Sequence, residues 1–501
     1  MIRRRKRFTV GEQAILHEPV DMRDESLDDN YHRVSVYHDK ELLDLVNNIH
    51  TMTVNNEFFS HEYIRGLKEE KKITESRKYV KNFAELQVEE IAKDPEKRVP
   101  LTQEDRESVI EAVINEIVGY GPLEPLLEDE TVTDILVNTY KHVYVERRGK
   151  LEPVPIQFKD NEHLLNIIRR IVEDTYRHID RVSPMVDARL DRETDRAADG
   201  VQRVRVNAII EPLAIDGPTL SIRKFPEEHM TLQRLIDNGT LTEDMANVLV
   251  GVCQAKLNVL ISGGTGSGKT TLLNALSEYI SPRERIITIE DTAELHLLQE
   301  HVVRLETRPP DPNSQEANKG EITQRDLLKN SLRMRPDRII VGEVRGNEAL
   351  DMLQAMNTGH DGSLTTIHAN SGRDALIRLE TMVAMASANT SSYFIRQSIS
   401  RAFHVVIQMA RLGDARKIIG IQEVTGMNDD VINMQDIFIF RQTGVDGDKV
   451  RGEFRPGGMP PKFIERFEAK GIQLSDMERF GSVGVGASFY DMFDSNNIVH
   501  V

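Results

Sequence analysis

A glycine-rich stretch near the middle of the chain carries the residue types that bind a nucleoside triphosphate. Residues 263–270 read GGTGSGKT, which matches the pattern G-x-x-x-x-G-K-[ST]. Glycines let backbone N–H groups point at phosphate oxygens, and the start of a following helix adds partial positive charge. Lys269 can reach the β- and γ-phosphates, and the hydroxyl of Thr270 can bind Mg²⁺. The predicted ligands are therefore ATP and Mg²⁺, and the predicted binding residues are Gly263, Gly264, Thr265, Gly266, Ser267, Gly268, Lys269, Thr270 and Thr271.

Acidic residues follow two other apolar strand patterns. Residues 287–294 read ITIEDTAE, with Glu290, Asp291 and Glu294 at or beyond the end of the strand. Residues 338–343 read RIIVGE and end in Glu343, where a metal-binding acid is needed. Because the carboxyl ends of parallel strands face the crevice in which an α/β sheet binds its ligand, we expect these carboxylates near the phosphate-binding loop.

Two histidines lie at the ends of a further strand pattern. Residues 358–370 read TGHDGSLTTIHAN and contain His360 and His368. A histidine at this place could donate to a phosphate oxygen or sense its absence, and the alternative is a structural histidine. We expect no metal bound by this pair, since no further ligand cluster accompanies it.

The elements that position these residues change in character along the chain. A strand pattern at 257–262 precedes the glycine-rich stretch and a helical pattern at 271–276 follows it, which is the context the motif requires. Strand and helix patterns alternate from about residue 230 onward, which predicts a parallel sheet with helices on both faces. Short β-rich runs with one helix at 161–178 predict an α+β domain before it, and we expect loops at Asp191–Gly200 and Arg451–Pro460.

These patterns divide the chain into six parts. They are a variable region at 1–75 whose order the sequence leaves open, a helical region at 76–130, an α+β N-terminal ATPase domain at 131–225, a linker at 226–232, a P-loop ATPase domain at 233–430, and a C-terminal region at 431–501.

Composition excludes several kinds of site. The chain of 501 residues has a formal net charge of −17, one cysteine and no tryptophan. The acidic field opposes a polyanion, so we expect no stable nucleic-acid binding. One cysteine can form neither an internal disulfide nor a cysteine-based zinc site, and we expect Cys253 to be a buried small hydrophobe. Without an apolar run of about 20 residues, we expect no membrane span and a cytoplasmic location.

The four motifs together resemble the Walker A, Asp box, Walker B and His box of the secretion ATPase superfamily, which drives type II and type IV secretion and type IV pili. In this order they read GGTGSGKTT, ITIEDTAEL, RIIVGEVRG and GHDGSLTTIHAN. Residues 119–149, 216–225 and 333–372 are similar to the CpaF-type branch, which powers tight-adherence (Flp/Tad) pili. The resemblance implies an α/β protein with an N-terminal helical region, an α+β (PAS-like) N-terminal domain and a RecA-like P-loop domain with a mostly parallel sheet.

The resemblance also implies roles for single residues. It implies that Glu294 polarises the attacking water and that Glu343 holds Mg²⁺ through water, with Thr270 as the second metal-binding residue. His368 would contact the nucleotide or couple its state to domain motion. Arg205 and Arg223 would reach the phosphates, and Arg203 lies close enough to leave the choice between it and Arg205 open. Lys269, Glu294, Glu343, His368, Arg205 and Arg223 are thus the predicted catalytic set.

Three functions follow as hypotheses. The first is a homohexameric ATPase motor for Flp/Tad-type pilus assembly or type II/IV secretion, peripheral to the inner membrane and acting on a platform protein there. The second is a conjugation-type (type IV secretion) transfer ATPase, and the third is a non-catalytic nucleotide-dependent scaffold. The single cysteine rules out the four-cysteine metal module that many type II members carry, which favours the Tad and conjugation-type branches.

Overall fold

A computed structural model describes the greater part of the chain. The described residues are 36–37, 39–54, 73–93, 101–147, 149–175, 177–193, 201–225, 230–310, 319–387, 389–447, 449–472 and 499–500. Contacts group the chain into two compact units, one made of residues 1–186 with 207–222 and the other of 187–206 with 223–501. The six-part division made from the sequence stays a prediction.

The first unit begins with helices that pack on one another. They are α2 (Lys40–Val54), α4 (Ile73–Lys93) and α5 (Gln103–Ile117), followed by the short helices η2 (Gly121–Leu123) and α6 (Glu124–Glu128). Helix α5 starts at a capping box in which Thr102 and Asp105 satisfy each other's backbone N–H groups. Its buried side chains include Val109, Val113 and Ile117, which recur at the spacing of one helix face.

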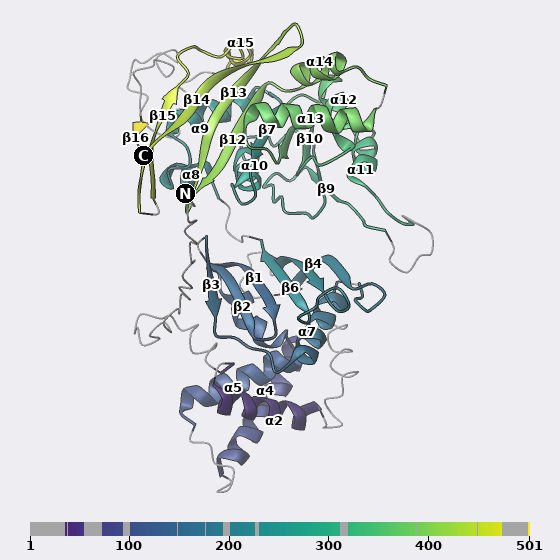
Figure 1. Ribbon diagram of the computed structural model, residues 1–501, viewed down its shortest axis with the longest axis vertical. Coiled ribbons are helices and arrows are strands. Elements are labelled where there is room, and N and C mark those ends of the chain that lie inside the picture. Colours follow the sequence, from purple (N-terminus) through teal and green to yellow (C-terminus); the bar gives the residue numbers. More distant parts are fainter. Residues whose placement is uncertain are drawn as a thin grey trace, which may run out of the picture. The chain divides into compact units, whose positions relative to one another are not determined.

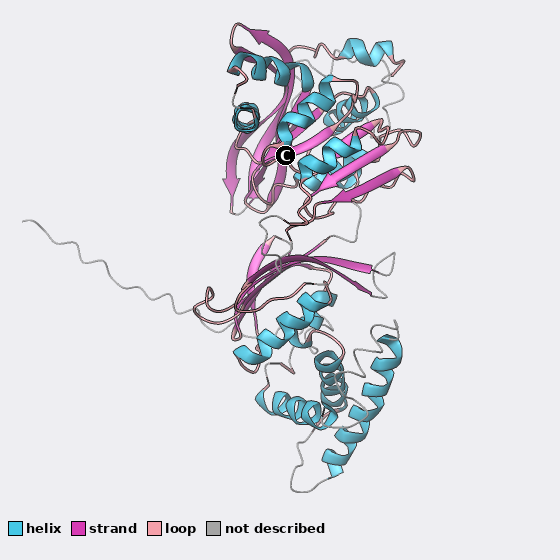
Figure 2. Cartoon of the chain, turned by 90° about the vertical axis from the view of Figure 1, so that its right-hand side faces the viewer, coloured by secondary structure: helices cyan, strands magenta, loops and turns pink. Residues whose placement is uncertain are grey.

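A six-stranded sheet follows these helices, and its residues 187–206, 223 and 224 are grouped with the second unit. Its strands are β1 (Val132–Thr139), β2 (His142–Arg147), β3 (Lys150–Val154), β4 (Met185–Glu193), β5 (Val201–Ile209) and β6 (Thr219–Lys224), in the order β3-β2-β1-β6-β5-β4. Strands β1, β2 and β3 form an antiparallel meander. Helix α7 (Asn161–Glu173) is capped by Asp160 and buries one apolar face, and Figure 2 shows helices against one side of this curved sheet. Of the loop expected at 191–200, residues 191–193 belong to β4 and the rest lies outside the described residues.

A ten-stranded sheet is the centre of the second unit (Figure 1). Its strands are β7 (Val259–Gly263), β8 (Ile286–Glu290), β9 (Val302–Glu306), β10 (Arg338–Val341), β11 (Leu364–Ile367), β12 (Val405–Leu412), β13 (Ala415–Asn428), β14 (Val431–Asp446), β15 (Lys449–Pro456) and β16 (Val499–His500). The strand order is β16-β15-β14-β13-β12-β7-β11-β10-β8-β9. The half from β12 to β9 is parallel and the half from β12 to β16 is antiparallel.

Helices cover both faces of the parallel half. Successive residues of a strand point to opposite faces: Val259 and Ile261 of β7 pack into one core with α9 (Glu243–Gln254) and α10 (Lys269–Ser277), whereas Leu260 packs into the other. The second core contains α12 (Glu348–Asn357), α13 (Gly372–Ala386) and α14 (Ser392–Ala402). The predicted α/β class with a mostly parallel sheet in the P-loop part is therefore confirmed. Among the described residues of this unit, the other helices are α8 (Leu232–Asp237), α11 (Gln324–Ser331) and α15 (Ile464–Ala469).

The loop expected at 451–460 is confirmed for residues 457–460 and was wrong for the residues before them. Residues 451–456 belong to strand β15, although the glycines and prolines of 451–460 favoured a loop. Gly452 lies against the ring of Phe440 on β14, so close that a Cβ atom would come within 2.1 Å of the ring. This glycine therefore permits tight packing within the sheet and does not mark a turn.

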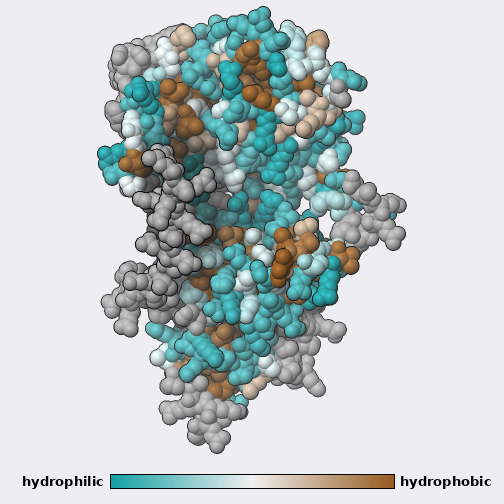
Figure 3. Space-filling view, in the orientation of Figure 1, coloured by the Kyte–Doolittle hydropathy of each residue, from teal (hydrophilic) through white to brown (hydrophobic). Residues whose placement is uncertain are grey.

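The surface and the single cysteine agree with the composition. On the face seen in Figure 3, hydrophobic residues form separate patches within a largely hydrophilic surface. Within the described part of the chain no helix combines the length and the apolar character needed to cross a membrane. Cys253 is buried in α9, and burial raises the pKa of its thiol to about 11.

Candidate active site

The glycine-rich loop connects the end of β7 to the start of α10. Gly266 and Gly268 have φ values of 68° and 93°, in the left-handed region that glycine adopts without strain. A Cβ atom at Gly263 would lie 2.5 Å from the Ser267 hydroxyl and 2.6 Å from the Met409 carbonyl oxygen, so this position also requires glycine. The backbone therefore folds into the tight loop that the sequence motif needs for phosphate binding.

Lys269 is the first residue of α10 and is largely buried. Its ammonium donates to the carbonyl oxygens of Gly263 and Gly264, at 3.0 and 2.9 Å, and so lies across the loop. Burial lowers the pKa of Lys269, while the charge of Glu343 acts in the opposite direction. The loop, this ammonium and the N-terminus of α10 provide the donors that a triphosphate needs.

His368 connects Lys269 to Glu343. Its Nδ1 atom lies 3.4 Å from the Lys269 ammonium, and its Nε2 atom lies 2.9 Å from Oε1 of Glu343. Burial, followed by the charge of Lys269, lowers the pKa of His368. These contacts fit a neutral imidazole that accepts from Lys269 at Nδ1 and donates to Glu343 from Nε2.

The two acidic motifs meet at neighbouring strands. Strands β8 and β10 pair in parallel with Val341 beside Ile289, so the acids that follow both strands lie at the same edge of the sheet. Arg345 bridges them, because its guanidinium donates to Glu343 at 2.9 and 2.6 Å and to Asp291 at 3.3 Å. The two strand ends therefore form one charged cluster beside the phosphate-binding loop.

Glu294 follows β8 and is held close to this cluster. Its backbone N–H donates to Oε1 of Glu290 at 3.0 Å. Burial raises the pKa of the Glu294 carboxyl, the charges of Arg223 and Arg205 lower it, and the charge of Glu343 raises it again. The charges of Glu343 and of two guanidinium groups therefore act on the Glu294 carboxyl.

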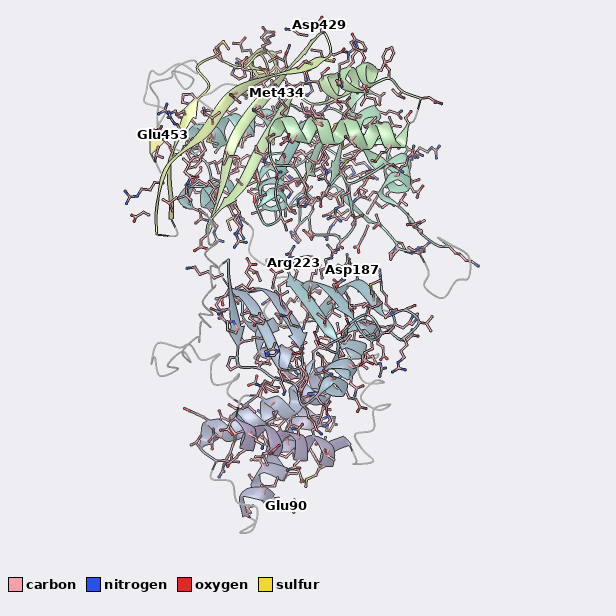
Figure 4. All side chains as sticks on the ribbon, in the orientation of Figure 1. Glu90, Asp187, Arg223, Asp429, Met434 and Glu453 are labelled. Atoms are coloured by element: carbon pink, nitrogen blue, oxygen red, sulfur yellow. The ribbon has the colours of Figure 1, made fainter. Side chains whose placement is uncertain are left out.

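The predicted arginines lie on neighbouring strands. Arg205 on β5 donates to both carboxylate oxygens of Asp187 on β4, at 3.1 and 2.6 Å, and this hydrogen bonding raises its pKa. Asp187 on β4 and Arg223 on β6 lie on the same side of the six-stranded sheet (Figure 4). Arg203 and Arg205 occupy alternate positions of β5 and so share a face, which leaves the choice between them open.

Other predicted residues have separate surroundings. His360 lies at the opposite end of β11 from His368, with its Nδ1 atom 3.2 Å from the Ala355 carbonyl oxygen, as a structural histidine would. Thr270 and Thr271 stand in the first turn of α10. Among the described residues, no group of three or more His, Cys, Asp or Glu could hold a metal alone. A site in which Thr270 and Glu343 share Mg²⁺ with phosphate oxygens needs no such group and fits these residues.

Two arginines near the loop were missed by the sequence analysis. Arg345 is two residues beyond Glu343, so its proximity could have been inferred from the motif itself. Arg416 on β13 donates from Nε to the Gly266 carbonyl oxygen at 3.0 Å. Because it comes from a hairpin far along the chain, no local sequence signal could have assigned this contact.

Residues 116–447 match the family model described as "Type II/IV secretion system protein". The chain belongs to this family. A Mycobacterium tuberculosis protein named for conjugal transfer is 34% identical over 339 residues, which cover 64% of this chain and 94% of its own length. The conjugal transfer protein TrbB of Rhizobium radiobacter is 30% identical over 310 residues, which cover 60% of this chain and 86% of its own.

Similarity within the type II/IV secretion family extends to VirB11 proteins. The type IV secretion system protein VirB11 of Brucella suis is 31% identical over 286 residues, covering 52% of this chain and 76% of its own length. A crystal structure of the Brucella suis VirB11 ATPase in complex with sulphate aligns at a TM-score of 0.32 and 28% identity, covering 60% of this chain and 92% of that chain.

Proposed function

We propose that this protein hydrolyses ATP at the glycine-rich loop and couples hydrolysis to mechanical work in a secretion or pilus-assembly machine. The observation that carries the proposal is the contact series from Lys269 through His368 to Glu343. The series joins the motif lysine, a histidine and the acid that follows β10, with Glu294 in the turn after the neighbouring strand β8. Membership of the type II/IV secretion family supports the same activity.

Each residue has a distinct part in the proposed reaction. The amides of residues 264–268 and Lys269 bind the β- and γ-phosphates, and Glu294 orients the water that attacks the γ-phosphate in line. Thr270 and Glu343 would hold Mg²⁺, which neutralises phosphate charge when it is bound. Arg205 or Arg203, together with Arg223, supplies guanidinium charge to the transition state, an effect on the order of 10³–10⁵ in rate in related chemistry.

His368 is proposed to report the state of the nucleotide. Its imidazole contacts both the phosphate-binding lysine and the acid of β10. A γ-phosphate that draws Lys269 away from His368 changes the partner of Nδ1, and the change reaches Glu343 through Nε2. Such a local exchange of hydrogen bonds is the kind of event that drives hinge motion in nucleotide-dependent machines.

We also propose which machine the protein powers. We favour a homohexamer that associates with the cytoplasmic side of an inner membrane through a platform protein and powers Flp/Tad-type pili. The long motif matches of residues 119–149 and 333–372 support this branch. A conjugation-type transfer ATPase is the second candidate. Two relatives that align with this chain over most of their own length are named as conjugal transfer proteins.

A complementation experiment tests the proposal and separates the two machines. A deletion strain receives the wild-type chain, Lys269→Ala, or Lys329→Ala as a control in the exposed part of α11. Wild type and control should restore surface pili or secretion, and Lys269→Ala should not. Restored DNA transfer without pili would favour the conjugation-type machine. Full activity of Lys269→Ala would exclude ATP-driven work and support the scaffold hypothesis.

A further inference from the structure

Glu290 is the last residue of β8 and is buried, with 3% of its surface exposed. Its Oε1 atom accepts two backbone hydrogen bonds, from the N–H of Glu294 at 3.0 Å and from that of Leu295 at 2.9 Å. A single carboxyl oxygen therefore caps the turn that carries Glu294. Among the three acids of ITIEDTAE, Glu290 thus points inward and restrains the backbone of the turn.

The neighbouring strand leaves room for this side chain. Val341 of β10 lies beside Ile289 of β8, and the Gly342 N–H continues the pairing by donating to the Ile289 carbonyl oxygen at 2.9 Å. A Cβ atom at Gly342 would approach Cγ of Glu290 to 2.9 Å. The Thr366 hydroxyl fixes this glycine by donating to its carbonyl oxygen at 2.7 Å. The glycine next to Glu343 therefore sets the place of the carboxyl that holds Glu294.

The buried carboxyl is suited to accepting hydrogen bonds without carrying charge. Burial raises the pKa of Glu290 to about 8, against the two backbone hydrogen bonds, which lower it. A neutral carboxyl and a carboxamide offer the same carbonyl acceptor at nearly the same place. Glutamine should therefore replace Glu290 with little change, whereas alanine would leave two backbone N–H groups without their acceptor.

We propose that Glu290 is a positioning residue, which fixes the turn after β8 and so sets where the Glu294 carboxylate stands relative to the phosphate-binding loop. The inference rests on the proposed role of Glu294 in ATP hydrolysis. It couples the two acidic motifs, because Gly342 of one motif determines the room available to Glu290 of the other. Glu290 acts through backbone geometry and takes no part in the reaction itself.

Glu423 offers a matched control. This buried carboxyl on β13 also accepts two backbone N–H groups, from Lys462 and Phe463, both at 2.9 Å. It pairs with Val405 at the start of β12, the end of the parallel strands opposite to the glycine-rich loop. Removing Glu423 therefore removes the same kind of backbone cap without touching the turn that carries Glu294.

The experiment compares Glu290→Gln, Glu290→Ala and Glu423→Ala with wild type in kcat and KM for MgATP and in amide hydrogen exchange. Glu290→Gln should keep kcat within about 3-fold, while Glu290→Ala should lower it by about 10–100-fold, the usual range for a lost orienting partner, with KM changed less than about 3-fold. Glu423→Ala should keep kcat. In Glu290→Ala the amides of Glu294 and Leu295 should exchange faster, and in Glu290→Gln they should stay protected.

Two results would overturn the inference. Equal kcat in Glu290→Ala and wild type would show that the cap does not set the active geometry. A Glu290→Gln variant as slow as Glu290→Ala, with both amides still protected, would show that the carboxyl itself enters the chemistry. An inactive wild-type protein would instead defeat the proposed function, and the exchange measurement would then still decide whether Glu290 holds the turn.

Discussion

His368 Nε2 lies 2.9 Å from Oε1 of Glu343, which links the residue that follows β11 to the acid that follows β10. The other nitrogen of the same ring lies 3.4 Å from the Lys269 ammonium. One imidazole therefore touches two of the groups expected to bind the phosphates and their metal. A movement of Lys269 or Glu343 would therefore change a contact of the His368 ring.

Replacing His368 should lower turnover more than affinity. His368→Ala removes both contacts, and we expect kcat to fall by about 10–100-fold, as for other lost orienting partners. His368→Gln keeps a donor near the Nε2 position and should retain more activity than alanine. Steady-state kinetics of the two variants checks this, with His360→Gln at the far end of β11 as the control. Equal losses for Gln and Ala would contradict the orienting role.

Full turnover should require the guanidinium of Arg345 as a bridge between Glu343 and Asp291. Its guanidinium contacts both Glu343 and Asp291, a geometry that an ammonium cannot reproduce. Arg345→Ala should therefore lower kcat by about 10-fold or more, and Arg345→Lys should lower it nearly as much. Measuring both variants alongside Arg373→Lys, an exposed residue of α13, tests the bridge. Full activity of the lysine variant would show that charge alone is sufficient.

A buried ion pair should stabilise the opposite end of the parallel strands. Arg338 is fully buried, pairs with Glu284 at 2.7 Å, and donates to the carbonyl oxygens of Cys253 and Gly362. Glu284→Ala leaves this guanidinium buried without its counter-charge, a change that costs about 3–5 kcal/mol. Chemical denaturation should show this loss, and Glu278→Ala provides a more exposed comparison nearby. A loss below about 1 kcal/mol would contradict the buried-pair account.

His404 should make stability depend on pH. Its Nδ1 atom accepts the Asn258 N–H at 3.0 Å, and burial, with the charge of Arg466, lowers its pKa to about 4 while Asp361 acts to raise it. Between pH 6.5, the usual pKa of histidine, and pH 4, His404 binds a proton in the unfolded chain and stays neutral in the folded chain. Stability therefore falls as the pH falls through this range. His404→Asn keeps an acceptor and cannot titrate. The free energy of unfolding, measured from pH 7 to 4.5, should therefore fall less in His404→Asn than in wild type. The same pH dependence in both proteins would contradict this.

The sequence predicted the local features well and the distant contacts poorly. The loop at 263–270, the strand-end acids and the alternating strands and helices follow from spacing and periodicity, and the structure has the strands where these patterns placed them. The inward direction of Glu290 depends on the room left by Gly342 on another strand. Arg416 reaches Gly266 only because β12 and β13 form a hairpin beside the loop.

The mistaken loop in the C-terminal region has the same origin. A sequence window containing Gly452, Pro456 and Gly457 is typical of a turn. In the folded chain, Phe440 of the neighbouring strand occupies the space that a side chain at Gly452 would need. Composition within one segment cannot reveal a packing requirement imposed by another segment, so this strand could not be predicted.

Phosphate release by Glu294→Gln is the most direct test of the central claim that this site hydrolyses ATP. Wild type, Glu294→Gln and the exposed control Glu89→Gln would be compared in single-turnover hydrolysis and in binding of a fluorescent ATP analogue. The account predicts binding within about 3-fold in all three proteins, and hydrolysis about 10²-fold or more slower in Glu294→Gln alone. Equal phosphate release from wild type and Glu294→Gln would contradict it.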